Sequence, residues 1–313
     1  MPERPYDVFV VGELNVDIIL TGDVTPVFGQ VEKIVDDLTV CAGSSSAIFS
    51  AAAAKMGLRV LFASRVGDDL FGQMMLRELA RAGVDASAVT VDPALKTGAG
   101  VMLSRGQDRA MLTFLGSIAQ VSRRDVPPDW ATRARHLHVA SPFLLTALRP
   151  EMPALMRQAH AAGMTVSLDT NWDPSGRWQV DDLLAHTDIL FPNENELKAI
   201  TGEDDLERAL RAMAARVPLV VVKRGERGAL AARGAERVAV PAFSVPVADT
   251  TGAGDTFDAG FLAGWLRGEP LPRCLLLGSA CAALAVQQVG GFNGQPTWEE
   301  ALAFLRQHGS EQS

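Results

Sequence analysis

The chain has 313 residues, of which 48% are hydrophobic and 21% are charged. This balance is typical of a globular protein and excludes a largely disordered chain, and the length allows one large domain or two smaller ones. The 29 Lys and Arg residues against 37 Asp and Glu residues give a net charge of −8, so no global positive field attracts nucleic acid or an anionic membrane.

Short β-rich apolar runs recur along the chain, and helical stretches separate them. The first run, Asp7 to Val11, is closed by Gly12, as in a strand buried on both faces of a parallel sheet. Similar runs lie at residues 59–63, 136–140, 165–168, 188–191 and 219–222, and helical stretches lie at residues 70–82, 151–162 and 206–216. This alternation predicts βαβ units, and hence an α/β fold with a mainly parallel central sheet covered on both faces.

Two segments interrupt the alternation: Leu14 to Val40, and Lys96 to Leu115. The second is predicted to be a β-hairpin that turns at residues 105–108. The two insertions either pair into a small sheet over the carboxyl edge of the main sheet, where ligands of α/β proteins bind, or form peripheral hairpins with no role in binding. We expect an α/β core of residues 1–12, 42–95 and 119–313, with a β lid of residues 13–41 and 96–118 over the acceptor site.

The cysteines, the N-terminal segment and the longest apolar run indicate the cellular compartment in which the protein is expected. Cys41, Cys274 and Cys281 form no C-x-x-C pair, and we interpret them as reduced thiols of a cytoplasmic protein. The N-terminal segment has acidic residues where a signal peptide needs a basic start. The apolar run from Cys274 to Val286 is shorter than the about 20 residues that span a bilayer, so it is predicted to be a buried helix.

Several common motifs are absent. No Gly-Lys dipeptide occurs, so there is no P-loop, and G-x-S-x-G and H-E-x-x-H are missing as well. Neither Gly98–Gly100 nor Gly252–Gly254 has a further glycine three residues on, so the dinucleotide-binding fingerprint is also missing. Hydrolase and dehydrogenase functions therefore lose their usual support.

The most informative segment is Asp249 to Phe261, where a glycine turn opens directly into an amphipathic helix. Backbone N–H groups at such a turn, together with the positive end of the helix dipole, form an anion site suited to phosphate. Asp255 would lie beside that anion, which is unfavourable for binding but suits a base that takes a proton from an attacking hydroxyl. The alternative is that Asp255 merely caps the helix.

This segment, D-T-T-G-A-G-D-x-x-x-A-G-F, resembles the C-terminal signature of the ribokinase-like (PfkB) carbohydrate kinases. Other motifs follow in the family's order: G-E-L-N-V-D at 12–17, the first signature at 43–57, V-G-D-D-L-F-G at 66–72, N-E-N-E at 193–196 and G-E-R-G at 225–228. The resemblance covers about residues 7 to 291. It implies a ribokinase-like three-layer sandwich with a β lid, and transfer of the γ-phosphoryl group of ATP to a hydroxymethyl group of a sugar or nucleoside.

The resemblance also implies roles for the residues of the transfer machinery. Asp255 resembles the catalytic base, and the amides of Gly252, Ala253 and Gly254 resemble the anion hole. Asn193 and Glu196 would hold the Mg²⁺–phosphate assembly through waters, since Mg²⁺ favours few carboxylates plus water. Alternatively, Asn193 and Glu196 are only a helix cap and a favourable first-turn acid.

Four further residues resemble the family's nucleotide and cation sites. Lys223, Gly225 and Gly228 correspond to the nucleotide wall, although a lone G-x-x-G is weak evidence by itself. Asp249 lies in a loop at which the family often uses a monovalent cation. The expected cofactors are therefore ATP and Mg²⁺, with K⁺ left open.

On the acceptor side, Asn15 and Asp17 share one face of an extended segment and resemble the family's sugar-hydroxyl ligands. Asp169 and Asn171 follow a strand at its carboxyl end, so they point into the same crevice or form an Asx turn. In the first signature, Gly43 is followed by Ser44 where many members carry a second glycine, and by Ile48 where many carry a sugar-binding asparagine. This departure bears on which acceptor fits.

We therefore expect an ATP-dependent, Mg²⁺-requiring kinase of a small sugar in the ribose or fructose class. The alternatives are a nucleoside kinase, or a sugar or nucleotide sensor that kept the fold and lost turnover. His136 and His138 share a strand face without a third ligand, so we interpret them as structural. The expected partner is a small-molecule acceptor, and no binding to nucleic acid or a membrane is expected. A homodimer formed through the lid is left open.

Overall fold

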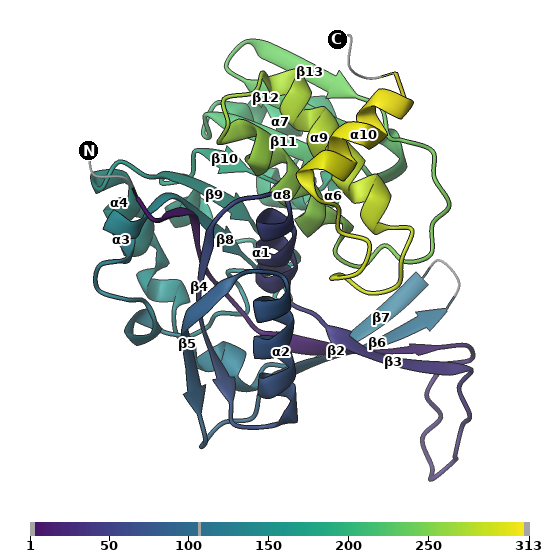
Figure 1. Ribbon diagram of the computed structural model, residues 1–313. Helices are drawn as coiled ribbons and strands as arrows, with labels where there is room; N and C mark the ends of the chain where they lie inside the picture. The colour runs from purple at the N-terminus through teal and green to yellow at the C-terminus, as the bar shows by residue number, and fades with distance from the viewer. Residues whose placement is uncertain (1–3, 106–107, 310–313) are drawn as a thin grey trace.

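The computed structural model describes residues 4–105 and 108–309. Over these ranges the backbone forms a nine-stranded sheet with helices on both faces, and a four-stranded sheet that extends away from it (Figure 1). The predicted α/β fold, a mainly parallel sheet with a small β lid, is confirmed.

In spatial order the strands of the larger sheet are β5 (Asp85–Asp92), β4 (Val60–Gly67), β1 (Tyr6–Val11), β8 (Ala134–Ala140), β9 (Thr165–Asp169), β10 (Ile189–Leu190), β11 (Leu219–Lys223), β12 (Ala229–Arg233) and β13 (Glu236–Val240). The seven neighbouring strands from the β5 edge to β11 are parallel to one another. At the far edge, β12 pairs in antiparallel fashion with both β11 and β13.

The central strand β1 explains why its sequence is apolar at successive positions. Val8 and Val10 lie in the hydrophobic core on one face of the sheet, whereas Phe9 and Val11 lie in the core on the other face. Because neighbouring side chains of a strand point to opposite faces, a strand buried on both sides needs an apolar residue at each position.

Two groups of helices cover these two faces. The first core includes residues of α1 (Ser45–Lys55), α2 (Leu70–Arg81), α8 (Ala253–Trp265), α9 (Leu271–Ala285) and α10 (Trp298–Gln307). The second includes residues of α3 (Trp130–Arg133), α4 (Met152–Ala161), α5 (Asp181–Leu184), α6 (Glu194–Thr201) and α7 (Leu206–Ala214). Short 3₁₀ helices lie at Gly116–Gln120, Arg123–Asp125, Arg149–Glu151 and Gly225–Arg227.

Close packing against α9 fixes the position of α8, and with it the glycine turn at the start of α8. A Cβ atom on Gly260 would lie 2.6 Å from the sulfur of Cys281 and 2.9 Å from the carbonyl oxygen of Leu277, so only glycine permits this close approach. The predicted buried helix is α9, and its cysteines, Cys274 and Cys281, are buried and free.

The lid is one sheet built from both insertions. Its strands, in spatial order, are β3 (Asp37–Ala42), β2 (Asn15–Thr21), β6 (Gly98–Arg105) and β7 (Asp108–Phe114). Strands β6 and β7 form the predicted hairpin, although residues 106–107 of the predicted turn lie outside the described residues. Because β2 pairs in parallel with β6, the two insertions are joined, and the alternative of separate peripheral hairpins is wrong.

Candidate active site

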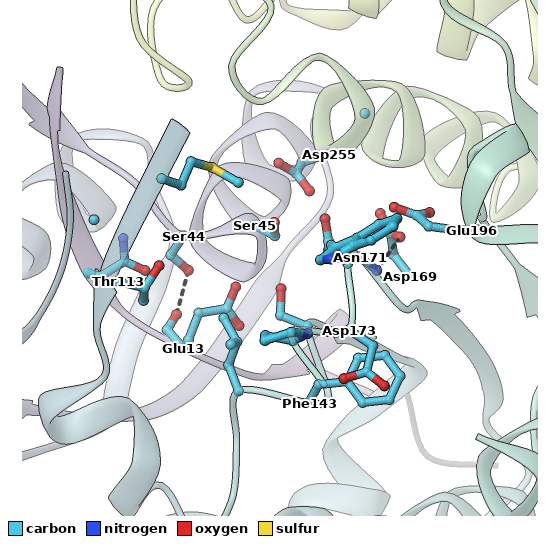
Figure 2. A pocket seen from close by; sticks show the side chains of 18 of the residues that line it. Glu13, Ser44, Ser45, Thr113, Phe143, Asp169, Asn171, Asp173, Glu196 and Asp255 are labelled. Carbon is cyan, nitrogen blue, oxygen red and sulfur yellow. Dashed lines mark hydrogen bonds between the residues drawn. The ribbon is translucent and has the colours of Figure 1, made fainter. Parts of the chain in front are cut away.

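A cavity of about 1740 Å³ lies where the lid meets the ends of the core strands. Figure 2 shows that its side chains come from several elements, with Glu13 and Asp255 on opposite sides of the space. Binding sites for one drug-sized molecule occupy about 300–1,000 Å³. The cavity therefore has room for two small molecules side by side.

The amino end of α8 forms one wall of the cavity. Gly252 adopts φ +73° and caps the helix without a side-chain hydrogen bond, and the amide of Thr256 donates to its carbonyl oxygen at 2.9 Å. Gly252 and Gly254 line the cavity. The amide of Ala253 donates to the carbonyl oxygen of Thr250 at 3.3 Å, so this third predicted anion-hole amide is engaged in a turn.

Asp255 is the third residue of α8 and lines the same cavity, while only 8% of the residue is exposed. It is not the cap of the helix, since that place belongs to Gly252. Burial, with a contribution from the Asp169 carboxylate, raises the pKa of Asp255 to about 8, although the Lys223 ammonium opposes the shift. A carboxyl group with such a pKa is suited to exchanging a proton near neutral pH.

Lys223 joins three segments of the chain through contacts with Asp169 and Asp258. Its Nζ atom lies 2.6 Å from Oδ2 of Asp169 and 3.1 Å from Oδ2 of Asp258, and 13% of its side chain is exposed. Burial alone would lower the pKa of Lys223, but the surrounding carboxylates outweigh it and raise that pKa. Lys223 does line the cavity, yet in this structure its charge is directed to two carboxylates.

Asp258 was missed by the sequence analysis. It lies one turn after Asp255 on α8 and is fully buried, and its Oδ1 atom finds no hydrogen-bond partner within the described residues. Burial raises the pKa of this carboxyl group. The available signal was the D-x-x-D spacing at residues 255–258, which places both carboxylates on one side of the helix.

The predicted pair Asn15 and Asp17 lies on the lid strand β2 and lines the cavity. Nδ2 of Asn15 donates to Oδ1 of Asp17 at 3.0 Å, and both residues are buried. A Cβ atom on Gly43 would lie 2.3 Å from the Asp17 carboxylate, and one on Gly100 would lie 2.9 Å from it. Glycine at both positions leaves room for this carboxylate.

Ser44 starts α1 in an uncommon conformation. Its φ angle is +74°, its Oγ atom accepts from the amide of Ala47 at 3.1 Å, and the same hydroxyl donates to the carbonyl oxygen of Glu13 at 2.5 Å. A residue with a side chain rarely adopts this region, so a glycine would fit the backbone at this position with less strain.

Ile48 lines the cavity from α1 and packs against the α8 turn. A Cβ atom on Gly252 would lie 2.9 Å from its Cγ2 atom, and one on Gly291 would lie 2.4 Å from its Cδ1 atom. Ile48 therefore fills the space beside the glycine turn of α8.

Glu13 is a second site residue that the sequence analysis missed. Its carboxylate accepts from the hydroxyl of Ser46 at 2.6 Å and from the amide of Ser46 at 3.2 Å, and burial raises its pKa. It lines the cavity although only 1% of it is exposed. An acidic residue directly after the first buried strand, within G-E-L-N-V-D, was the signal.

Asp169 is the last residue of β9, and Asn171 follows the strand and lies close to it (Figure 2). The amide of Asn171 donates to Oδ1 of Asp169 at 3.2 Å, as in the expected Asx turn, and both residues also line the cavity. Asn171 adopts φ +49°, and its buried Nδ2 finds no partner within the described residues. This amide is a donor available for a bound molecule.

Asn193 and Glu196 form a capping box at the start of α6. Oδ1 of Asn193 accepts from the amide of Glu196 at 3.0 Å, while the Glu196 carboxylate accepts from the amide of Asn193 at 2.8 Å and from its Nδ2 at 2.6 Å. Both residues line the cavity, and burial raises the pKa of Glu196 to about 7. Capping is confirmed as local structure, and an oxygen pair facing the cavity also suits water-mediated Mg²⁺ binding.

The remaining predicted residues lie at or behind the cavity wall. Gly225 lines the cavity with φ +55°. Gly228 packs closely elsewhere, since a Cβ atom there would lie 2.0 Å from the carbonyl oxygen of Val240. Asp249 joins two loops, because its carboxylate accepts from the amide of Thr251 and from the amide of Gly290, each at 2.9 Å.

The two strand histidines are structural. His136 contacts Thr165 and Ser167, and His138 contacts Ser167 at 2.8 Å and stacks on Phe49. Within residues 4–105 and 108–309, the structure contains no cluster of three metal-ligating His, Cys, Asp or Glu side chains. In the same ranges no helix combines the length and apolar character needed to cross a membrane.

Comparisons with known proteins agree with this geometry. A family model described as pfkB family carbohydrate kinase matches residues 6–298. The chain is 32% identical to an ATP-dependent ribose-1-phosphate kinase from Halopiger xanaduensis over 94% of this chain and 96% of that protein. It is 27% identical to a ribokinase from Haemophilus influenzae over 95% and 97% of the two chains. A solved structure of a putative ribokinase II from E. coli in complex with ATP and Mg²⁺ has a TM-score of 0.86 and 26% identity, covering 97% of this chain and 100% of that one.

Proposed function

The chain belongs to the pfkB family of carbohydrate kinases, and we propose that it transfers the γ-phosphoryl group of ATP to a hydroxymethyl group of a small sugar in the ribose or fructose class. The supporting observation is the placement of Asp255, which is buried at the start of α8 and faces a cavity with room for two ligands. A carboxylate beside an anion site is poor for binding phosphate and well suited to acting as a base.

In the proposed reaction, Asp255 accepts the proton of the acceptor hydroxyl as its oxygen attacks the γ-phosphorus. The new oxygen–phosphorus bond forms while the bond from the γ-phosphorus to the bridging oxygen breaks, and ADP leaves with that oxygen. The amides at the start of α8, at Gly252 and Gly254, stabilise the charge on the transferred group.

Asn193 and Glu196 are proposed to orient the metal-bound nucleotide through waters, beside Gly225 and Lys223. When bound, Mg²⁺ supplies charge neutralisation on the phosphates. A K⁺ site at the Asp249 loop is a further proposal, supported by the carboxylate that joins the two loops next to α8.

Replacement of Glu196 by Gln is expected to raise the Mg²⁺ concentration for half-maximal rate by at least about 10-fold, because one negative charge beside the metal–phosphate assembly is lost. Gln can still accept the amide of Asn193, so α6 should keep its cap. Initial rates over a Mg²⁺ titration measure the effect, and KM for the acceptor serves as the control. An unchanged Mg²⁺ dependence would leave Glu196 with the capping role alone.

At the acceptor end, Asn15 and Asp17 are proposed to bind sugar hydroxyls, and the unpartnered Nδ2 of Asn171 supplies another donor. Ile48 presents an apolar surface there and cannot form a hydrogen bond with a hydroxyl group of the acceptor. A hydroxyl left unpaired against it would cost roughly 1–3 kcal/mol, so the natural acceptor should turn an apolar edge toward Ile48.

Replacement of Ile48 by Asn is therefore expected to shift preference toward a fully hydroxylated pentose or hexose. The ratio of kcat/KM between such a sugar and the natural acceptor should move by about 10-fold or more. The value for the natural acceptor should fall, since a buried amide would lack a partner. Identical ratios in mutant and wild type would mean that Ile48 does not face the acceptor and only packs on Gly252 and Gly291.

A homodimer through the lid is also proposed. The segment between β2 and β3 exposes Phe28 and Ile34 at 96% and 89%. Exposed apolar side chains of this size are typical of an interaction surface. Replacing both with Ser should convert a dimer into a monomer in sedimentation experiments, if the lid forms the contact.

A further inference from the structure

Three aromatic rings pack together beside the cavity, two of them from the segment that follows β9 and one from the segment that follows β8. Trp172 lines the cavity and is 59% exposed. Trp178 packs edge-on against Trp172 with ring centroids 5.2 Å apart, and against Phe143 with centroids 5.8 Å apart. Phe143 also lines the cavity and lies beside Asp173 in Figure 2. We call Phe143, Trp172 and Trp178 the aromatic wall.

This wall is held in a defined conformation. Asp173 is buried, and its carboxylate accepts from the amide of Trp178 at 2.7 Å, from the amide of Ser175 at 2.8 Å and from the hydroxyl of Ser175 at 2.9 Å. These hydrogen bonds outweigh burial and lower the pKa of Asp173. Trp178 has φ +52°, a region that a bulky side chain rarely adopts and that persists only where surrounding contacts enforce it.

The lid supplies apolar side chains to the same cavity. Met102 lies on β6, Met111 lies on β7, and Leu115 follows β7. Met111 is 56% exposed. Methionine side chains adapt to differently shaped apolar ligands. The polar pair Asn15 and Asp17 is therefore accompanied by apolar surface that the hydroxyl groups of a bare pentose do not match.

We propose that Trp172 determines acceptor specificity, and that the preferred acceptor carries a flat, uncharged ring attached to its sugar, as a nucleoside does. This inference rests on the proposed phosphoryl transfer, and for the acceptor it favours the nucleoside alternative over a bare sugar of the ribose or fructose class. Asn171 is adjacent to Trp172 and has an unpartnered amide, so a donor for sugar oxygen lies next to a surface for ring stacking.

Arg177 suggests the main rival, an acceptor that carries a phosphate. It lines the cavity, is exposed and has no ion pair within the described residues. The nearby Arg149 is neutralised by Asp182, with two hydrogen bonds of 2.8 and 2.7 Å. One exposed arginine is weaker support than three packed rings, two of which lie on a segment with a strained backbone.

The test is calorimetric binding of adenosine, uridine, ribose and ribose 1-phosphate to the enzyme without ATP. The wild type should bind at least one nucleoside about 10-fold or more tightly than ribose. Trp172→Ala should remove most of that difference while leaving ribose binding nearly unchanged, and Trp172→Phe should retain most of it. Arg177→Gln is the matched control in the same segment and should leave nucleoside binding unaltered.

Equal affinity for nucleosides and ribose in the wild type would overturn the inference, as would an equal loss of both in Trp172→Ala. Preference for ribose 1-phosphate that disappears in Arg177→Gln would establish the rival. Because binding is measured without turnover, this result is separate from the kinase proposal, which fails only if no acceptor in the panel becomes phosphorylated.

Discussion

Replacement of Asp255 by Asn is expected to lower kcat by about 10²- to 10⁴-fold, the usual cost of losing a general base. Asn has nearly the same size as Asp, so the packing of α8 should persist. ATP affinity should also change little, because Asp255 faces the acceptor hydroxyl in the proposed reaction. Single-turnover kinetics and ATP titration measure the two effects separately.

Asp258→Asn offers a matched control, since the same change is made one turn further along α8. That variant weakens the contact with Lys223, 3.1 Å away, and keeps the proposed base. It should lower stability and cost less than about 10-fold in kcat. If Asp255→Asn keeps activity within a factor of a few of the wild type, Asp255 is not the base.

Replacement of Lys223 by Met is expected to lower the free energy of unfolding by about 3 kcal/mol. The ammonium group lies between the buried carboxylates of Asp169 and Asp258, and removing it leaves two buried acids without their shared cation. Urea unfolding measures the loss, and Lys223→Arg, which keeps the charge, should recover part of it. An unchanged midpoint would show that the contacts of Lys223 with the two carboxyl groups do not contribute to stability.

The same variant is expected to move the pH profile of kcat/KM. Burial and the Asp169 charge raise the pKa of Asp255 to about 8, and the Lys223 ammonium opposes that rise. The base acts when deprotonated, so kcat/KM of the wild type should increase with pH up to about 8. Without Lys223 the pKa of Asp255 rises further, and the increase should shift to higher pH. A shift toward lower pH would contradict this placement of charges.

The core of the fold is predictable because its strands and motifs are local. Residues 8–11 and 219–222 are apolar at every position, and burial on both faces of a parallel sheet explains both runs. Strands β5, β12 and β13 were not predicted. They lie at or near the edges of the sheet, where β5 and β13 are largely half-buried or exposed. Accordingly, Asp85–Asp92 has an acidic residue at each end and Glu236–Val240 begins with two charged residues.

Site residues that belong to one continuous motif can be predicted from the sequence. Site residues that distant segments of the chain bring together are harder to predict. Asp255 and the glycine turn come from a single continuous segment. Lys223, by contrast, contacts Asp169 and Asp258, which lie 54 and 35 residues away in the chain, and no local pattern indicates such a cluster. Glu13 lines the cavity itself, and its carboxylate is held there by Ser46, 33 residues on, a contact that likewise depends on the tertiary structure.

The most direct test of the central proposal is acceptor-dependent formation of ADP together with a phosphorylated acceptor. The purified protein is mixed with ATP, Mg²⁺ and a panel of sugars and nucleosides, and the products are identified by mass spectrometry and phosphorus NMR. We predict equal amounts of ADP and of a phosphate monoester on a hydroxymethyl group, for at least one acceptor, and neither product with Asp255→Asn. Tight binding of an acceptor without any phosphorylated product would contradict the proposal and would favour a sensor built on the kinase fold.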